Sequence, residues 1–363
     1  NHKVVIKEYD IALVVGTRPN FVKAAPLLKK LEDNNKSVLF IHTGQHFDKN
    51  MSNNIFEDLN LRNPDLNLDA PKDSQSKQFQ YIVEELEKVF KNFKINKVGV
   101  FGDVTSTLAA SIAAKNANKY LFHVESGLRS NNLNMPEERN RIMVDAVSDL
   151  LLIPSDDAME NLLNEKVSAH KIFNVGNIMI DTLSDNKEKI IENLYEIKEQ
   201  LKITKPYFVM TLHRPSNLTD IILSNIFQAV NKFTESYEII LPAHPRLKNF
   251  IDNQKISFNN ILLIEPLSYI DFMSLVYGSS LVLTDSGGIQ EETTYLGINC
   301  LTLREETERP ITVTEGTNKV IGINKEKIIN EINNSLESNI LNETMIKYWD
   351  GKTSDRIYEI LFG

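Results

Sequence analysis

The sequence predicts an α/β protein built from two doubly wound domains, each with a parallel sheet covered by helices. Short apolar runs alternate with helical patterns along the chain, which is typical of parallel strands joined by helical crossovers. The same series then occurs a second time after a break. A chain of 363 residues is also long enough to form two hydrophobic cores.

The first series of apolar runs predicts the strands of an N-terminal sheet. Helical patterns lie between these runs, such as "FVKAAPLLKKLED" at 21–33 and "STLAASIAAKNA" at 106–117. The expected strands of this sheet are residues 11–16, 37–44, 97–103, 120–125 and 150–155.

The second series predicts a C-terminal sheet of the same kind. The break falls in "NVGNIMIDTL" at 174–183, just before a charged helical stretch at 188–202. We therefore predict an N-terminal domain at 1–178, a C-terminal domain at 179–345, and a closing helix at 346–363 that packs back on the N-terminal domain. The expected strands of the second sheet are residues 207–213, 237–244, 261–266, 280–286 and 299–304.

Composition and charge exclude several classes of protein. The formal net charge is −9 and there is no long basic tract, so nucleic acid is not expected as the main ligand. The single cysteine, Cys300, cannot form an internal disulfide and is expected to be a buried strand residue in a reducing compartment. No apolar run approaches the length of a membrane span, and the N-terminus lacks signal-peptide features. A cytoplasmic protein without a membrane partner is therefore expected.

Polar side chains follow most of the expected strands, at the point where each strand ends. In doubly wound sheets ligands bind at the carboxyl ends of the strands. A single histidine at such a place is more often structural, but the same placement in both halves predicts a cleft between two domains, lined by both. The residues at these strand ends are Gly16, Thr17 and Arg18; Gln45 and His46; Asp103; His123, Glu125 and Arg129; His213 and Arg214; His244 and Arg246; Ser286 through Glu292; and Arg304 and Arg309.

The segment "TDSGGIQEE" at 284–292 predicts an anion site at a helix N-terminus. Unpaired N–H groups and a partial positive charge occur there, and Ser286, Gly287 and Gly288 would let a diphosphate approach closely. An ordinary strand-to-helix turn is the alternative. Glu292 lies one turn later, where its carboxylate could accept hydrogen bonds from a ribose. Diphosphate followed by ribose indicates a nucleotide.

Carboxylates near this anion site predict acid and base chemistry. Glu137 and Arg141 are four residues apart on an expected helix, so a surface ion pair is the simple alternative. Beside Asp103 and Glu125, however, Glu137 completes a set that could divide acid and base roles. No metal-ligand cluster, dinucleotide fingerprint or P-loop is present in the sequence.

With these residues assembled, the chain closely resembles the non-hydrolysing UDP-N-acetylglucosamine 2-epimerases. The resemblance covers nearly the whole length, in family order, and the segments together are highly specific. The segments are "GTRPNFVKAAPL", "HTGQHFDKNM", "GDVTSTLAA", "HVESGLRS", "MPEERNR", "TLHR", "PAHPR", "TDSGGIQEE" and "TERPITVTEGTNKVIG".

This resemblance implies a GT-B-type fold, with two Rossmann-like doubly wound domains and an interdomain cleft. It implies reversible epimerisation at carbon 2 of UDP-N-acetylglucosamine, giving UDP-N-acetylmannosamine, by elimination and re-addition of UDP. It also implies no cofactor and no metal, a homodimer, and a place in polysaccharide biosynthesis.

The resemblance also assigns roles to individual residues, without deciding which carboxylate removes the carbon 2 proton. The implied catalytic residues are Asp103, Glu125, Glu137, Arg141 and His213. The implied substrate-binding residues are Arg18, Lys23, Ser286, Gly287, Gly288, Glu292 and Arg304. Candidates for a second, activating UDP-sugar site are Gln45, His46, Arg214 and His244.

Departures from the family pattern keep alternatives open. Asn20 stands where family members often have glutamate, and "HRPSN" stands where many bacterial members have "HRREN". Because Pro215 and Ser216 carry no charge, we expect activation by substrate to be weak or absent. A short linker before "MPEE" leaves other UDP-N-acetylated sugars open, namely a di-N-acetylated uronic acid or a 6-deoxy sugar. A GT-B glycosyltransferase, a hydrolysing epimerase and a non-catalytic binding module are further alternatives.

Overall fold

The computed structural model describes residues 6–45, 55–254, 260–338 and 345–363. The chain divides into two compact units. The first contains Asn1–Ser184 together with Lys347–Gly363, and the second contains Asp185–Ile346. Each unit has one parallel sheet with helices on both faces, which confirms the predicted fold class.

The first unit has a seven-stranded sheet in the order β3-β2-β1-β4-β5-β6-β7. Every strand pair in it is parallel, so all strands end at the same edge. Its strands are β1 (Glu8–Val15), β2 (Val38–His42), β3 (Leu66–Asn67), β4 (Lys94–Phe101), β5 (Tyr120–Val124), β6 (Leu150–Ile153) and β7 (Ile172–Asn174).

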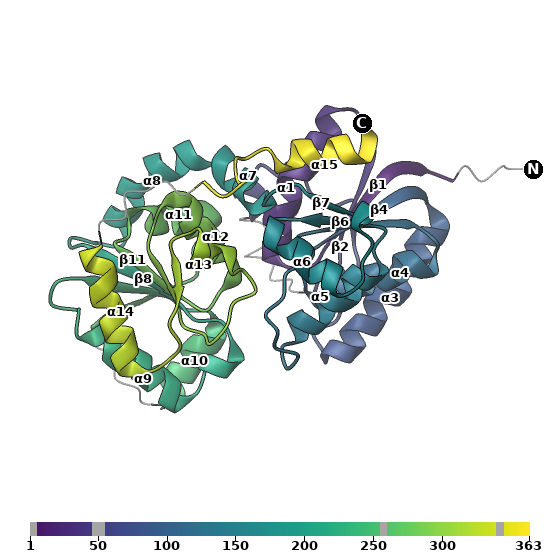
Figure 1. Ribbon diagram of the computed structural model, residues 1–363. Coiled ribbons are helices and arrows are strands. Elements are labelled where there is room, and N and C mark those ends of the chain that lie inside the picture. Colours follow the sequence, from purple (N-terminus) through teal and green to yellow (C-terminus); the bar gives the residue numbers. More distant parts are fainter. Residues whose placement is uncertain (1–5, 46–54, 255–259, 339–344) are drawn as a thin grey trace, which may run out of the picture. The chain divides into compact units, whose positions relative to one another are not determined.

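Helices cover both faces of this sheet (Figure 1). Helices α3, α4 and α5 lie on one face, and α1 and α15 pack together on the other. The helices of the unit are α1 (Arg18–Asp33), α3 (Gln75–Asn92), α4 (Thr105–Asn116), α5 (Pro136–Val147), α6 (Asp156–Asn164), the short η1 (Ala169–Lys171), α7 (Ile178–Asp185) and α15 (Thr353–Phe362).

The second unit has a six-stranded parallel sheet in the order β10-β9-β8-β11-β12-β13. Helices α9 and α14 pack against each other, as do α8 and α11. Its strands are β8 (Tyr207–Thr211), β9 (Glu238–Pro242), β10 (Ile261–Ile264), β11 (Leu281–Thr284), β12 (Cys300–Thr302) and β13 (Asn318–Val320). Its helices are α8 (Lys187–Gln200), the short η2 (Pro215–Asn217), α9 (Asp220–Asn231), α10 (Pro245–Gln254), α11 (Tyr269–Gly278), α12 (Gly287–Leu296), α13 (Ile311–Thr314) and α14 (Lys325–Glu337).

Each unit has its own hydrophobic core, formed where strand side chains meet the covering helices. In the first unit β1, β4 and β5 pack against α3 and α4, with Val98, Val100 and Leu121 fully buried. In the second unit β8, β9 and β11 pack against α9 and α14 in the same way. Central parallel strands are buried on both faces, which explains their continuous apolar runs.

The chain returns to the first unit after Ile346. Trp349 is 3% exposed and its Nε1 donates to the Pro154 carbonyl at 2.9 Å. The Asp181 carboxylate accepts hydrogen bonds from the backbone N–H groups of Thr353 and Ser354 at 3.0 and 2.8 Å, so it caps the N-terminus of α15. Helix α7, which carries Asp181, therefore belongs to the first unit, and the division falls after Ser184 and not after residue 178.

In the described part of the chain, no helix combines the length and the apolar character needed to cross a membrane.

Candidate active site

Two turns at the carboxyl edge of the first sheet carry the predicted acidic residues. Strands β4 and β5 end level with each other, because Phe101 is paired with Val124. The Gly102 N–H donates to the Val124 carbonyl at 3.1 Å, and Asp103 follows Gly102 directly. Glu125 follows the end of β5. The structure therefore brings the turns of Asp103 and Glu125 together at one edge.

Glu125 is held at this edge by a buried lysine. Its Oε1 accepts a hydrogen bond from Lys23 Nζ, which comes from α1, at 2.9 Å. The Glu125 side chain is only 4% exposed, and a charge this deeply buried needs a partner. Its φ of 66° lies in the left-handed region, which costs a non-glycine residue about 1–2 kcal/mol. Such local strain is typical of functional turns.

Asp103 is held by Arg141, which lies in the middle of α5. The Arg141 Nη2 donates to Asp103 Oδ2 in a close ion pair, and Asn140 Nδ2 donates to the Asp103 carbonyl at 2.9 Å. Arg141 is 2% exposed. Its Nε and Nη1 have no hydrogen-bond partner among the described residues. Unpaired buried donors are costly, and a bound ligand is one kind of partner that could satisfy these two groups.

Glu137 lies in the first turn of α5, which begins at Pro136. It is half-buried, and its carboxylate forms no hydrogen bond or ion pair within the described ranges. Arg141 pairs with Asp103, so the surface ion pair between Glu137 and Arg141 does not form. The neighbouring Glu138 is structural, because its Oε1 accepts from the Ser130 N–H at 2.9 Å.

Small polar groups complete this edge. The Thr17 hydroxyl, just before α1, and the Ser126 hydroxyl, just after Glu125, are buried without a partner in the described part of the chain. Arg18 is the first residue of α1 and is half-buried. Gly102 adopts φ +68°, and a Cβ there would lie 3.1 Å from Lys23 Nζ, so a larger residue would crowd the Lys23–Glu125 pair.

One candidate for the second site, Gln45, is fixed inside the first unit. Its Oε1 accepts from both the N–H and the hydroxyl of Ser106, at 2.8 and 2.5 Å. The Thr43 hydroxyl lies 2.7 Å from the same hydroxyl. Gln45 therefore positions the first turn of α4. His46, the adjacent candidate, lies outside the described residues.

The N-terminus of α12 in the second unit has the predicted form. Ser286 is the N-cap residue and makes no side-chain capping bond, and the helix begins with Gly287 and Gly288. The first backbone N–H groups of the helix thus have no side-chain cap, which suits an anion. A Cβ on Gly287 would lie 2.0 Å from Arg309 Nη1 and 2.5 Å from Glu308 Oε1. This ion pair leaves no room for a Cβ at position 287, and the role of Gly287 in the approach of a phosphate stays a prediction.

Asp285, just before Ser286, fixes the segment that carries His213 and Arg214. Its fully buried carboxylate accepts from the N–H groups of His213 and Arg214, at 2.9 and 3.0 Å. Asn217 Nδ2 donates to the same carboxylate at 3.0 Å. The His213 side chain is exposed, so its imidazole is accessible in this unit.

The remaining predicted residues of the second unit differ in their burial and in their hydrogen-bond partners. Glu292 is buried in the second turn of α12. Burial, reinforced by the nearby Glu292, raises the pKa of the Tyr269 hydroxyl. Arg304 Nη2 pairs with Glu308 Oε2 at 2.8 Å. His244 is exposed after β9, and its Nδ1 accepts from the Arg246 N–H at 3.3 Å.

Cys300 is a fully buried residue of β12, and burial raises the pKa of its thiol to about 12. A thiol with such a pKa is not ionised near neutral pH, so it is a strand residue and not a nucleophile. Within the ranges the structure describes, no group of three or more His, Cys, Asp or Glu side chains could hold a metal ion.

Sequence reasoning missed the residues that support these groups. Asp285 and Glu308 lie in quoted segments but were given no role, and Asp145 lies outside those segments. Asp285 and Asp145 accept from residues distant in sequence, whereas Glu308 pairs with Arg304 four positions away. Asp285 does follow an apolar run directly, so the strand-end rule could have singled it out.

The fold and these two sheet edges first define the class: a GT-B-type protein with two Rossmann-like units. A family model described as UDP-N-acetylglucosamine 2-epimerase matches residues 29–362. The chain therefore belongs to the UDP-N-acetylglucosamine 2-epimerase family.

Individual relatives agree with this assignment. The UDP-N-acetylglucosamine 2-epimerase of Methanococcus maripaludis is 38% identical over 370 residues, covering 98% of this chain and 99% of the relative. The UDP-2,3-diacetamido-2,3-dideoxy-D-glucuronate 2-epimerase of Pseudomonas aeruginosa is 36% identical, covering 97% of this chain and 99% of the relative. The crystal structure of Methanocaldococcus jannaschii UDP-GlcNAc 2-epimerase in complex with UDP-GlcNAc and UDP superposes with a TM-score of 0.90 at 37% identity, covering 97% of this chain and 99% of that chain.

Proposed function

We propose that this enzyme interconverts UDP-N-acetylglucosamine and UDP-N-acetylmannosamine without a cofactor. The proposal is carried by two carboxylates at one sheet edge, buried Glu125 and half-buried Asp103, which each pair with a basic side chain. The chain that holds them matches this family over nearly its whole length. Relatives of higher identity are named for this substrate, and the diacetamido-glucuronate epimerase is slightly more distant.

The proposed reaction is an elimination followed by a re-addition. A carboxylate takes the carbon 2 hydrogen as a proton, its electron pair forms a double bond to carbon 1, and the bond from carbon 1 to the UDP oxygen breaks. In the second step UDP adds back to carbon 1 while a proton reaches carbon 2 from the opposite face. The products of the first step are therefore 2-acetamidoglucal and UDP, and atoms and charge balance.

We propose Asp103, Glu125 and Glu137 as the acid and base groups of these steps. Two proton transfers on opposite faces of one carbon require two differently placed groups. Lys23 and Arg141 support this assignment, because each fixes one carboxylate and brings positive charge to a buried site. Glu137, which has no partner among the described residues, is free to reach substrate.

UDP is the leaving group, and its developing charge needs stabilisation. We propose that Ser286, Gly287 and Gly288 bind the diphosphate through the uncapped N-terminus of α12, and that Glu292 accepts hydrogen bonds from the ribose. His213 and Arg18 add positive or hydrogen-bonding groups for the departing diphosphate. We also propose that Arg304, which is held by a buried ion pair with Glu308, helps to bind the substrate.

Further features of the proposal rest on family membership and on the chemistry of the substrate. We propose a homodimer, which light scattering of the purified protein tests directly. A cytoplasmic location fits an enzyme that consumes a nucleotide sugar, and its product would supply polysaccharide biosynthesis. Arg214 and His244 stay proposed second-site candidates, and Arg214 is held inside the second unit, where its Nε donates to the Asp285 carbonyl at 3.1 Å.

A chromatographic assay tests the proposed reaction. The enzyme is incubated separately with UDP-N-acetylglucosamine and with UDP-N-acetylmannosamine, without any acceptor. We expect the same equilibrium mixture from both directions, with no net accumulation of free UDP. Stoichiometric free UDP and N-acetylmannosamine would instead identify a hydrolysing enzyme. If UDP-N-acetylglucosamine stays unchanged and the UDP-linked diacetamido-glucuronate is converted, the substrate is the diacetamido-glucuronate sugar.

A further inference from the structure

The first unit contains a cluster of buried charges to which the reaction scheme above assigns no role. His123 lies in β5, and its Nδ1 is 2.6 Å from Asp145 Oδ1, in the last turn of α5. Arg129 Nη2 is 2.8 Å from the other oxygen of Asp145 and 2.7 Å from Glu165 Oε2. His123 and Asp145 are fully buried, and Arg129 nearly so. Removing charges from water costs desolvation free energy, and contacts between the buried charges must offset this cost.

The two ring nitrogens of His123 face different oxygen atoms. Its Nε2 lies 2.7 Å from the Gly102 carbonyl, which can only accept, so Nε2 carries a hydrogen. Burial acts to raise the pKa of Asp145, but His123, Arg129 and the Gly127 N–H outweigh it and hold that pKa below its ordinary value. Nδ1 in turn faces the Asp145 carboxylate, so both ring nitrogens lie within hydrogen-bond distance of oxygen acceptors. His123 therefore bridges a carboxylate and a carbonyl.

This bridge joins the two turns that carry the catalytic carboxylates. His123 binds the carbonyl of Gly102, the residue before Asp103. Asp145 Oδ2 accepts from the Gly127 N–H at 3.0 Å, two residues after Glu125. Both turns are left-handed, with φ of +68° at Gly102, 66° at Glu125 and +80° at Gly127. Of these three residues only Glu125 is not a glycine, so its conformation is strained and persists only where surrounding contacts hold it.

We propose that His123, Asp145 and Arg129 are positioning residues, which set the separation and orientation of the Asp103 and Glu125 carboxylates during the reaction. The proposal rests on the proposed function, because it assigns these carboxylates to chemistry. A displacement of about 1 Å at a reacting group can lower turnover about 100-fold. Loss of the cluster should therefore lower kcat while substrate binding in the second unit persists.

The first test is Asp145→Asn. The new amide oxygen can still accept from His123, but its NH2 group would face the Gly127 N–H and Arg129, which are donors themselves. We expect kcat to fall about 10- to 100-fold, with KM and UDP affinity within about threefold of wild type.

Asp149→Asn is the matched control. Asp149 Oδ2 accepts from the Leu121 N–H and from Lys115 Nζ, at 2.8 and 2.7 Å, so it ties the amino end of β5 as Asp145 ties the carboxyl end. This variant loses a partly exposed ion pair at the other end of β5, at a distance from the two turns. Its kcat should stay within about twofold of wild type.

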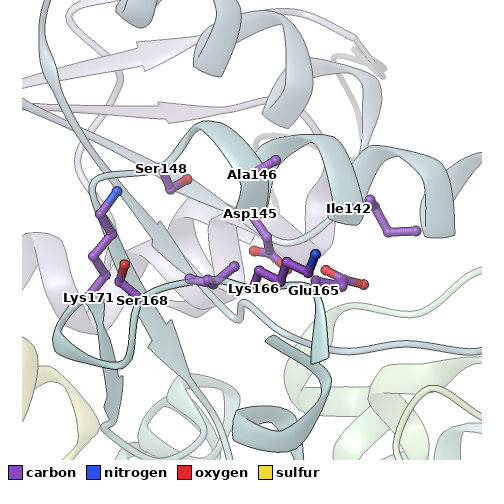
Figure 2. Close-up of a pocket in the computed structure, with 9 residues that line it drawn as sticks. Ile142, Asp145, Ala146, Ser148, Glu165, Lys166, Ser168 and Lys171 are labelled. Carbon is purple, nitrogen blue, oxygen red and sulfur yellow. The ribbon is translucent and has the colours of Figure 1, made fainter. Parts of the chain in front are cut away.

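The second test is chemical rescue of Arg129→Ala. Both carboxylates that hold the Arg129 guanidinium line a pocket of about 360 Å³, which Figure 2 shows in close-up. A free guanidinium ion can enter this pocket and take the vacated place, since it presents the same fork of donors to Asp145 and Glu165. Guanidinium below unfolding concentrations should restore kcat at least threefold, and sodium at equal ionic strength should not.

A measurement independent of turnover tests the charge on the cluster. Nitrogen-15 NMR of the wild-type histidines at neutral pH should show one buried ring with both nitrogens protonated, absent in His123→Gln. A neutral His123 would overturn the proposal even if the reaction is as proposed. A fall in melting temperature alone, with kcat equal for Asp145→Asn and Asp149→Asn, would assign the cluster to stability and also overturn it. A wild-type enzyme without epimerase activity would contradict the proposed function, and NMR would still decide the state of the cluster.

Discussion

Glu125 combines a position at a strand end, a strained backbone conformation and a buried carboxylate. It follows an apolar strand, has a left-handed backbone, and its carboxylate is buried against Lys23 at 2.9 Å. Each feature alone has a structural explanation. Together they describe a carboxylate whose position is enforced from both the backbone and the side chain, as a proton-transfer group requires.

We predict that Glu125→Gln lowers kcat about 100-fold or more, because an amide cannot accept the carbon 2 proton or return one. Asp103→Asn and Glu137→Gln should behave alike. UDP binding, measured by calorimetry, should remain within a few-fold of wild type, since the nucleotide is proposed to bind to the second unit.

Glu85→Gln is a control, because it removes a half-buried carboxylate that pairs with the exposed Lys88 at 2.7 Å on α3. It should leave kcat unchanged. Near-normal turnover in Glu125→Gln would remove Glu125 from the set of catalytic residues.

At the scale of secondary-structure elements, the N-terminus of α12 links packing to the proposed binding of UDP. The helix starts at Gly287 against the Arg309–Glu308 pair, and it leaves its first N–H groups without a side-chain cap. Gly287 therefore packs against a buried ion pair and also begins the helix end that is proposed to bind an anion.

We predict that Gly287→Ala weakens UDP binding about 10-fold or more, because the added Cβ displaces Arg309 and tilts the first turn. Gly297→Asn is the control at the other end of α12. Gly297 has φ +73° with no atoms near its missing Cβ, and asparagine tolerates this conformation. Calorimetry of UDP binding should separate the two variants, and equal affinities would contradict the anion site at this helix.

The composition of the short helix η2 leads to a prediction about activation by substrate. It contains Pro215 and Ser216 and therefore brings no charged side chain next to His213 and Arg214. We expect hyperbolic kinetics with UDP-N-acetylmannosamine as the only substrate. A sigmoidal curve that a trace of UDP-N-acetylglucosamine converts to a hyperbola would refute this expectation.

The elements also show how much the sequence could predict. The central strands were found because strands buried on both faces leave long apolar runs. The edge strands β3, β7 and β13 were missed, since segments of two or three residues carry no measurable period.

The candidate site was predictable to a similar degree. Asp103 and Glu125 follow from the strand-end rule, but their partners do not. Arg141 pairs with Asp103, which is 38 positions away in sequence, and not with Glu137 four positions away. Contacts of this kind depend on how helices and strands pack, which local patterns do not encode.

On the scale of the whole molecule, the chain leaves the first unit and returns to it. The return is fixed by Trp349 and by Asp181, which caps α15. The final helix then packs on α1, the helix that carries Lys23 and begins at Arg18. Stability of the first unit therefore depends on residues at both ends of the sequence.

We predict that Trp349→Ala destabilises the protein by about 3–5 kcal/mol, because it empties a buried site and leaves the Pro154 carbonyl unpaired. Trp349→Phe keeps most of the ring volume and should cost less than half as much. Thermal and denaturant unfolding measure the difference. Equal stability of both variants and wild type would show that the return of the chain adds nothing to the fold.

The most direct test of the central claim is proton NMR of the wild-type enzyme with UDP-N-acetylglucosamine in deuterium oxide. We predict that deuterium appears at carbon 2 of the sugar as a UDP-N-acetylmannosamine signal grows. Product formation with the carbon 2 proton fully retained would contradict proton transfer by the carboxylates of the first unit. Absence of both exchange and product, with UDP still bound, would contradict the proposed substrate.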